Sequence, residues 1–384
     1  MDERNYTPTH KDPQRLEGSP AGREYIHPKR QQRQRTGGRV EAAQGKNGTK
    51  MNRKKKRITL KKVLIIAASV LTALFLIFNL LLFYFTGKVS IVETGKRDTS
   101  IKPTMESDDV KNILIIGSDT RDLEAAGRTD AMIILSINKK KKEIVMTSLM
   151  RDMYLPLVGY ASDGTKMYND DEPDGLYRNK LNSAYVFGGA ELLMDSIQYN
   201  FGLKIDEYFY IDFSTFINII DAVGGITLDV TKEEVKVMNS SIRGQNRALG
   251  KPVMQDQINS SGSLLLNGNQ ALSYARLRQV GNADFQRTQR QRLVINKVLD
   301  KVKDSGMIKK FEFLKVLMSN LTTNMSRSEL FFYGYKAPFY LGYTIKELRI
   351  PGDKDYEFGT HSGQSTLDID LEKCREAMRK EIFS

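Results

Sequence analysis

Residues 112–150, NILIIGSDTRDLEAAGRTDAMIILSINKKKKEIVMTSLM, decide the fold of this chain. Three apolar runs, at 112–117, 131–138 and 143–150, have the length and composition of buried β-strands. Four lysines at 139–142 separate the second run from the third and predict the solvated turn of a β-hairpin. In such a hairpin, the start of one strand and the end of the next lie at the same edge of the sheet.

Charged side chains stand at that predicted edge. They precede the second strand, follow the third, and follow the first, which would reach the same edge if it paired antiparallel with the second. The members of this group are Asp119, Arg121, Arg128, Asp130, Arg151 and Asp152. The sequence therefore predicts that three segments deliver acids and arginines to one place.

A second basic cluster lies between residues 266 and 292. The run 266–275 is typical of a short helix, and Arg276 and Arg278 follow it. Asp284 is a plausible N-cap of the next helix. We expect Arg287, Arg290 and Gln291 to share one face of that helix, since they are three and four positions apart. Arginines at a helix N-terminus favour a bound anion between them.

Arginines and carboxylates in this combination are typical of phosphate chemistry. The arginine fork grips phosphate oxygens bidentately, and Mg²⁺ commonly binds one or two carboxylates together with substrate phosphates. The pattern predicts transfer or hydrolysis at a phosphate or pyrophosphate. The alternative is that these residues form surface salt bridges, as is usual in a chain with 27% charged residues.

The net charge of +13 resides in the N-terminal tail. Residues 1–62 contain 18 Lys and Arg against 6 Asp and Glu, and the rest of the chain contains 41 against 40. The tail has few apolar residues, and we expect it to be disordered. A nearly neutral remainder argues against specific nucleic-acid binding by the protein as a whole.

Residues 63–85 form a run of 23 residues without a charge, long enough for a transmembrane helix. Basic residues crowd its N-terminal flank, so the positive-inside rule predicts a cytoplasmic N-terminus, near anionic lipid, and an extracellular remainder in a Gram-positive-type cell envelope. A cleaved signal peptide is the competing interpretation, but its apolar region would be shorter.

The remaining segments carry weaker signals. Residues 239–262 are polar and rich in turn formers. The apolar residues of 192–201 and 213–223 recur at helical spacing and fit either a core or a tunnel for a lipid chain. A single cysteine, Cys374, excludes an intramolecular disulfide.

Seven ordered motifs resemble the LytR-CpsA-Psr family over about residues 108–305. These motifs are GSDTR (117–121), RTDAM (128–132), SLMRDM (148–153), NKLNSAY (179–185), IIDAVGG (219–225), ALSYARLR (271–278) and DFQRTQRQR (284–292). The resemblance implies an α/β fold: an α/β/α sandwich around a central mixed sheet, preceded by one transmembrane helix. We accordingly divide the chain into a basic cytoplasmic tail, a transmembrane helix, a linker, a catalytic domain and a C-terminal extension that packs on or completes it. Their ranges are 1–62, 63–85, 86–107, 108–305 and 306–384.

The resemblance also implies an activity. Family members transfer a glycopolymer, such as wall teichoic acid or capsular polysaccharide, from a polyprenyl-pyrophosphate carrier to peptidoglycan through a phosphodiester bond. Asp119 and Asp130 match the family's Mg²⁺-associated aspartates. The pyrophosphate-binding set, with its less firmly assigned members included, comprises Arg121, Arg128, Arg151, Lys180, Arg276, Arg278, Arg287, Arg290 and Gln291. Asp119, Arg151 and Asp284 are the candidate catalytic residues, and either aspartate is a candidate base.

Two other functions share these features. A pyrophosphatase would use the same site and release free polymer phosphate. A membrane-bound transcriptional attenuator would use the basic tail on nucleic acid, although membrane topology and contact with anionic lipid explain that tail more simply.

Overall fold

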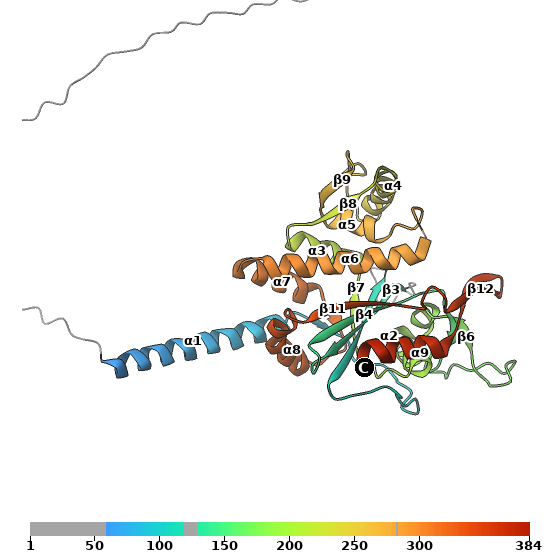
Figure 1. The fold of residues 1–384 in the computed structure, drawn as a ribbon, viewed down its shortest axis with the longest axis horizontal. Coiled ribbons are helices and arrows are strands. Elements are labelled where there is room, and N and C mark those ends of the chain that lie inside the picture. The colour runs from blue at the N-terminus through green and yellow to red at the C-terminus, as the bar shows by residue number, and fades with distance from the viewer. Residues whose placement is uncertain (1–58, 119–128, 282) are drawn as a thin grey trace, which may run out of the picture. The chain divides into compact units, whose positions relative to one another are not determined.

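A computed structural model describes residues 59–118, 129–281 and 283–384. The predictions for Asp119, Arg121, Arg128 and residues 1–58 of the tail concern residues outside these ranges. The described helices are α1 (Leu60–Thr86), α2 (Ser183–Phe201), α3 (Phe213–Ala222), α4 (Lys232–Ala248), α5 (Gly268–Ala275), α6 (Ala283–Asp304), α7 (Met307–Asn320), α8 (Arg327–Tyr340) and α9 (Leu371–Phe383). Figure 1 shows their arrangement.

The central sheet is mixed and has the order β1-β10-β7-β2-β3-β4-β11. Its strands are β1 (Ser90–Ile91), β10 (Thr322–Thr323), β7 (Glu207–Ile211), β2 (Val110–Ser118), β3 (Thr129–Asn138), β4 (Glu143–Leu149) and β11 (Thr344–Ile350). Three short ladders accompany it: β5 (Tyr154–Pro156) with β6 (Arg178–Lys180), β8 (Ile226–Val230) with β9 (Gly262–Leu266), and β12 (Tyr356–His361) with β13 (Gln364–Ile369).

The predicted hairpin is the centre of this sheet. Strands β3 and β4 pair antiparallel, with Met132 opposite Leu149, and β2 pairs antiparallel with β3, with Ser118 opposite Thr129. The end of β2, the start of β3 and the end of β4 therefore meet at one edge, as the sequence predicts. The family resemblance placed this sheet inside an α/β/α sandwich, and that prediction is confirmed.

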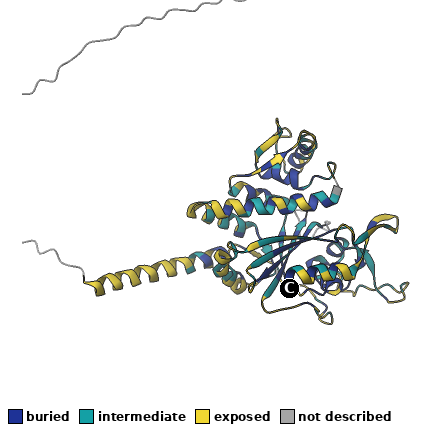
Figure 2. Cartoon of the chain, viewed as in Figure 1, coloured by how far each residue is buried: buried dark blue, intermediate teal, exposed yellow. Residues whose placement is uncertain are grey.

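Each face of the sheet has its own helical layer, because alternate residues of a strand point to opposite sides. Leu114 of β2 packs in the core beneath α2 and α9, where Ile197 and Cys374 are also buried. Its neighbour Ile113 faces the other layer and packs with Met318 of α7 and Leu330 of α8. Figure 2 shows this burial along the central strands.

Helices α3 to α6 and the β8–β9 ladder enclose a further core. The prediction of a turn-rich segment at 239–262 is wrong for its first half, because α4 continues to Ala248. Met238 and Ile242 bury one side of this helix, and a capping box between Thr231 and Glu234 fixes its start. The sequence prediction missed this helix because most of its residues are polar and few apolar residues mark its buried face.

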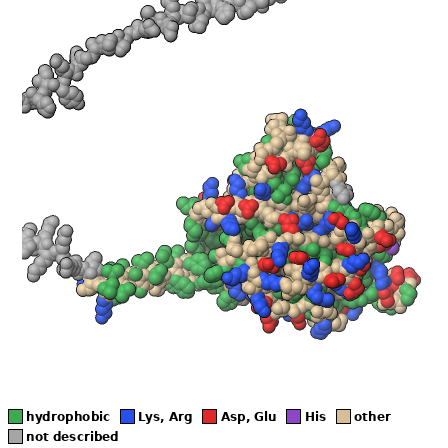
Figure 3. All heavy atoms as spheres, in the orientation of Figure 1, with side chains coloured by type: hydrophobic (Ala, Val, Ile, Leu, Met, Phe, Trp, Pro, Cys, Tyr) green, Lys and Arg blue, Asp and Glu red, His purple; other side chains and the backbone are tan. Residues whose placement is uncertain are grey.

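The apolar helix α1 is long enough to cross a membrane. Its side chains are largely exposed in the structure, and hydrophobic residues cover it along its length (Figure 3). Exposure of so much apolar surface is unfavourable in water but is expected of a helix surrounded by lipid.

Candidate active site

Among the described residues, four cations surround three carboxylates at the sheet edge where β3 begins and β4 ends. The cations come from the turn after β4, from β6, from the segment after α5 and from the first turns of α6. These residues are Arg151, Lys180, Arg278 and Arg287, and the carboxylates belong to Asp130, Asp152 and Asp284. Elements distant in the sequence therefore assemble one charged group.

Arg151 is the centre of this group. Its Nη1 lies 2.9 Å from Asp130 Oδ1, its Nε 3.3 Å from Asp152 Oδ2, and its Nη2 3.2 Å from Asp284 Oδ2. Burial lowers the pKa of Arg151, but the charges of Asp284, Asp152 and Asp130 outweigh burial and raise this pKa. The guanidinium therefore stays charged and is held in one orientation.

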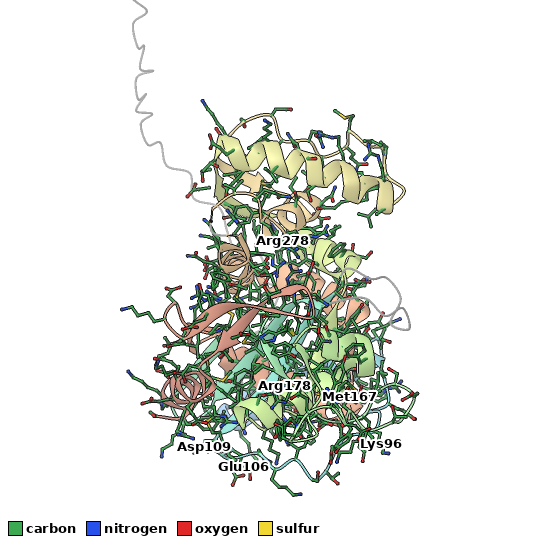
Figure 4. The ribbon with its side chains drawn as sticks, turned by 90° about the vertical axis from the view of Figure 1, so that its right-hand side faces the viewer. Lys96, Glu106, Asp109, Met167, Arg178 and Arg278 are labelled. Atoms are coloured by element: carbon green, nitrogen blue, oxygen red, sulfur yellow. The ribbon has the colours of Figure 1, made fainter. Side chains whose placement is uncertain are left out.

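Arg278 and Arg287 complete the group from the helical side. Arg278 Nη2 donates to Asp130 Oδ1 at 2.8 Å, and Arg278 Nε lies 3.3 Å from Asp284 Oδ1. Arg287 Nη1 lies 3.1 Å from the same Asp284 oxygen. In Figure 4, Arg278 lies in the upper part of the view, whereas Arg178 and Met167 lie well below it.

Arg287 is buried but incompletely bonded. Its side chain is only 2% exposed, and within the described part of the chain neither its Nε nor its Nη1 makes a hydrogen bond. The approach of Nη1 to Asp284 is thus an ion pair without good hydrogen-bond alignment. Burial, together with the positive charges of Arg278 and Arg151, lowers the pKa of Arg287 to about 10 despite Asp284 and Asp130. An anion at this position would supply both missing partners.

Lys180 joins the group through Asp152. Its Nζ lies 2.9 Å from Asp152 Oδ1. Burial raises the pKa of Asp152, but the hydrogen bond from Lys180 and the charges of Arg151 and Lys180 outweigh burial. The pKa of Asp152 is therefore lower than its usual value. Asp152 thus links two predicted phosphate-binding cations, a role that the sequence did not assign to it.

A pocket of about 950 Å³ opens beside these residues. Its lining includes predicted site residues, which are Asp130, Arg151, Arg276, Arg278, Arg287 and Gln291. Helix α4 forms another part of the wall through Lys236, Ser240 and Ser241. Arg276 also stacks over the ring of Phe213, 4.3 Å from its centroid, which orients this guanidinium.

Arg290 does not join this group. Its Nη2 lies 2.7 Å from Glu234 Oε1, and its guanidinium also donates to the carbonyls of Leu277 and Val280 and lies over the ring of Tyr274. The expectation that Arg290 acts together with Arg287 and Gln291 fails, because its side chain turns toward Glu234 of α4 and does not line the pocket that Arg287 and Gln291 line. The side chain of Arg290 connects α6 to α4.

Asp284 lies in the first turn of α6 instead of at the N-cap, because the helix begins one residue earlier, at Ala283. The carboxylate nevertheless lies near the helix N-terminus, where the macrodipole favours a negative charge. Asp284 Oδ1 is buried and makes no hydrogen bond to the described residues, although two arginines lie within ion-pair distance.

The donor set suits a hard divalent cation only in part. Carboxylate oxygens of Asp130 and Asp284 are of the right chemical type. However, no group of three or more His, Cys, Asp or Glu residues in the described ranges could hold a metal ion by itself. Mg²⁺ usually completes its shell with water and substrate phosphates, so these carboxylates fit a shared site with a phosphorylated ligand.

The fold is a mixed sheet between helical layers, preceded by one apolar helix that is long enough to cross a membrane, and its pocket is lined by arginines and a carboxylate. The profile of the LytR_cpsA_psr family matches residues 81–380, and the chain belongs to this family.

Relatives and solved structures agree with this assignment. The teichoic acid transferase TagU of Bacillus licheniformis is 28% identical over 243 residues, which cover 63% of this chain and 68% of that protein. Biofilm regulatory protein A of Streptococcus mutans is 31% identical, over 62% and 55% of the two chains. The alignments with some relatives thus cover little more than half of their length. A structure of TagT with octaprenyl pyrophosphate has a TM-score of 0.51 at 18% identity, covering 77% of this chain and 100% of the other, and shows a shared fold.

Proposed function

We propose that this protein is a phosphotransferase that moves a glycopolymer from a polyprenyl-pyrophosphate carrier to peptidoglycan. The observation that carries the proposal is the buried Arg287, two of whose nitrogens make no hydrogen bond to the residues that the structure describes and lie near Arg151 and Arg278, where an anion would pair with all three. The relatives named as polyisoprenyl-teichoic acid–peptidoglycan teichoic acid transferases support the same reaction class.

In this proposal the pyrophosphate occupies the arginine cluster. A sugar hydroxyl of peptidoglycan attacks the phosphorus that bears the polymer, and a new oxygen–phosphorus bond forms. The bond from this phosphorus to the bridging oxygen breaks, and polyprenyl phosphate leaves. Arg151, Arg278 and Arg287 bind and orient the phosphates, and fixed cations of this kind stabilise the charge that develops on the transferring group.

The hydroxyl proton passes to a carboxylate, for which Asp119 and Asp284 are the candidates. Mg²⁺, held by Asp119 and Asp130 and by phosphate oxygens, would supply further charge neutralisation. Arg121, Arg128, Lys180, Arg276 and Gln291 complete the proposed pyrophosphate-binding set. Each of these assignments follows from the family motifs and from the chemistry of the side chains.

We also propose that α1 spans the membrane, with the N-terminal tail in the cytoplasm and the folded part outside. The support is the length and exposure of α1 and the basic residues on its N-terminal flank. This topology places the pocket on the side where peptidoglycan lies.

The test is a reconstituted reaction. The full chain in lipid nanodiscs is incubated with a polyprenyl-pyrophosphate oligosaccharide, peptidoglycan oligomers and Mg²⁺, and the products are analysed by mass spectrometry. We expect a phosphodiester-linked adduct that disappears with EDTA. Free sugar phosphate without an adduct would instead establish a pyrophosphatase. Absence of turnover with specific DNA binding by the tail would favour a regulator.

A further inference from the structure

Exposed apolar side chains gather on two helices beside the end of α1. On α7, Met307 and Ile308 are 81% and 79% exposed, and on α8, Phe332 and Phe339 are 63% and 72% exposed. Several large apolar side chains on neighbouring helices form a patch of the kind that marks an interaction surface. Figure 3 shows hydrophobic side chains continuing from α1 onto this part of the molecule.

Helix α8 packs directly against the last turns of α1. The hydroxyl of Tyr335 donates a hydrogen bond to Asn79 Oδ1, and the Tyr335 ring meets Phe78 edge to face with centroids 5.2 Å apart. A Cβ at Gly334 would lie 2.7 Å from Leu82 Cδ2, so glycine permits this close approach. The polar side chain of Asn79 thus finds its partner on α8.

The exposed aromatic residues of α8 flank Tyr335, which contacts α1. Phe332, Tyr335 and Phe339 are spaced i, i+3 and i+7 and therefore share one face. Helix α7 repeats the arrangement, since the Phe311 ring lies 4.9 Å from that of Phe85 of α1, and Met307 is one turn before Phe311. The apolar patch is therefore continuous with α1.

The length of α1 sets the depth of this contact. A helix rises about 1.5 Å per residue, so Asn79 lies about 26 Å and Leu82 about 30 Å beyond Lys62. The hydrocarbon core is about 30 Å thick. If Lys62 marks its inner boundary, the residues that bind Tyr335 and Gly334 lie at the outer boundary, and α8 must lie at the same level.

From this geometry we propose that α7 and α8 form a membrane-contacting surface that lies in the outer leaflet around α1. Met307, Ile308, Phe332 and Phe339 enter the interfacial region, where aromatic and aliphatic side chains of amphipathic helices are stable. The two helices carry five basic residues against two acidic ones, a balance that favours contact with anionic lipid. The proposal rests on the proposed membrane span of α1.

This surface would also orient the pocket. Only Ser305 and Gly306 separate α7 from α6, and α6 carries Arg287 at its other end. A fixed position of α7 at the bilayer therefore sets the direction of α6, and with it the height of the arginine cluster above the leaflet that holds a polyprenyl carrier.

Single-cysteine labelling of the full chain tests the proposal. The native Cys374 is fully buried, and burial raises the pKa of its thiol to about 12, so an introduced cysteine is labelled selectively. We choose Phe339→Cys on α8 and Phe358→Cys on β12 as a matched control, because the two phenylalanines are 72% and 74% exposed. Leu71→Cys, in the middle of α1, reports on the span itself.

Each variant carries an environment-sensitive fluorophore and is placed in nanodiscs that contain doxyl-labelled lipid, with iodide as the aqueous quencher. We expect lipid quenching at position 339 to exceed that at position 358 at least twofold. We also expect lipid quenching at position 71.

Three results would overturn the proposal. Iodide access at 339 with lipid quenching at 71 would remove the membrane-contacting surface and leave the span intact. Shielding of 339 from both quenchers would show that protein, such as a second copy of the chain, covers it. Iodide access at 71 would remove the span and the surface together.

Discussion

At the scale of single residues, the site depends on arginines that share the same carboxylate. Arg151, Arg278 and Arg287 all lie within 3.3 Å of Asp284, which keeps three like charges close together. The same arrangement leaves Arg287 short of hydrogen-bond partners in the described structure. A ligand phosphate would relieve both the repulsion and the unpaired donors.

We predict that Arg287→Lys weakens binding of inorganic pyrophosphate about tenfold. Lysine keeps the charge but loses the planar fork that binds two oxygens. Thermal unfolding with increasing pyrophosphate measures the effect, because a ligand that binds the folded state raises its stability by mass action. Equal midpoint shifts in the wild type and the variant would show that Arg287 does not contact the anion.

Arg290 should act on stability. Removing one partner of a buried ion pair costs about 3–5 kcal/mol, so Arg290→Met should lower the free energy of unfolding by about that amount. Adding Glu234→Gln, which removes the unpaired charge but can keep the capping bond to Thr231, should restore most of the loss. Denaturant unfolding measures all three proteins, and an unchanged midpoint for Arg290→Met would contradict this assignment.

Asp152 gives a pH dependence. Its pKa is lowered in the folded protein, so its contribution to stability is present above the unfolded value near 3.8 and is lost as pH falls through the lower folded value. Asp152→Asn should therefore be less stable than the wild type at pH 6, and this difference should shrink below about pH 4. Urea unfolding at both pH values checks this; a difference that grows on acidification would have the wrong sign.

At the scale of elements, close packing of α5 on α3 holds the segment that carries Arg276 and Arg278. A Cβ at Gly268 would lie 2.3 Å from the Ile217 carbonyl oxygen, and backbone cannot yield as a side chain can. Asn267 caps α5 and forms a reciprocal capping box with Gln270, which fixes the start of the helix.

Gly268→Ala should therefore destabilise the protein by about 1–3 kcal/mol, as overpacking does. Gly244→Ala is the control, since its Cβ would meet open space within helix α4. Alanine there should be neutral or slightly stabilising, because it is the better helix former. Equal unfolding midpoints for the two variants would argue against the tight α3–α5 contact.

Prediction from the sequence succeeded best where a local pattern of apolar and charged residues determines the structure. The hairpin of β3 and β4 followed from two apolar runs and four lysines, and its register brings Asp130 and Arg151 together. It failed for α4, whose buried residues are sparse, and for Arg290, whose direction depends on a partner 56 residues away. The role of Asp152 depends on Lys180 of another ladder, which no local pattern reveals.

At the scale of the whole molecule, the sheet and the helical cores meet at the arginine cluster. Arg151 follows β4 of the central sheet, whereas Arg278 follows α5 and Arg287 lies in α6, and these two helices share a separate core. Ser148 of β4 accepts a hydrogen bond from Arg292 Nη1 at 2.7 Å, and Glu347 of β11 accepts one from Arg292 Nε at 2.8 Å. These bonds fix α6 on the sheet, so the site is largely preorganised, as electrostatic catalysis requires.

The most direct test of the proposed reaction compares Arg151→Ala with Arg178→Ala in the reconstituted transfer assay. Arg178 pairs with Asp174 away from the pocket and serves as a matched arginine control. We predict that Arg151→Ala lowers the rate of phosphodiester-linked adduct formation at least 100-fold, with Arg178→Ala close to wild type and all three proteins folded by thermal unfolding. Near-wild-type transfer by a folded Arg151→Ala protein would contradict the assignment of this arginine cluster as the active site.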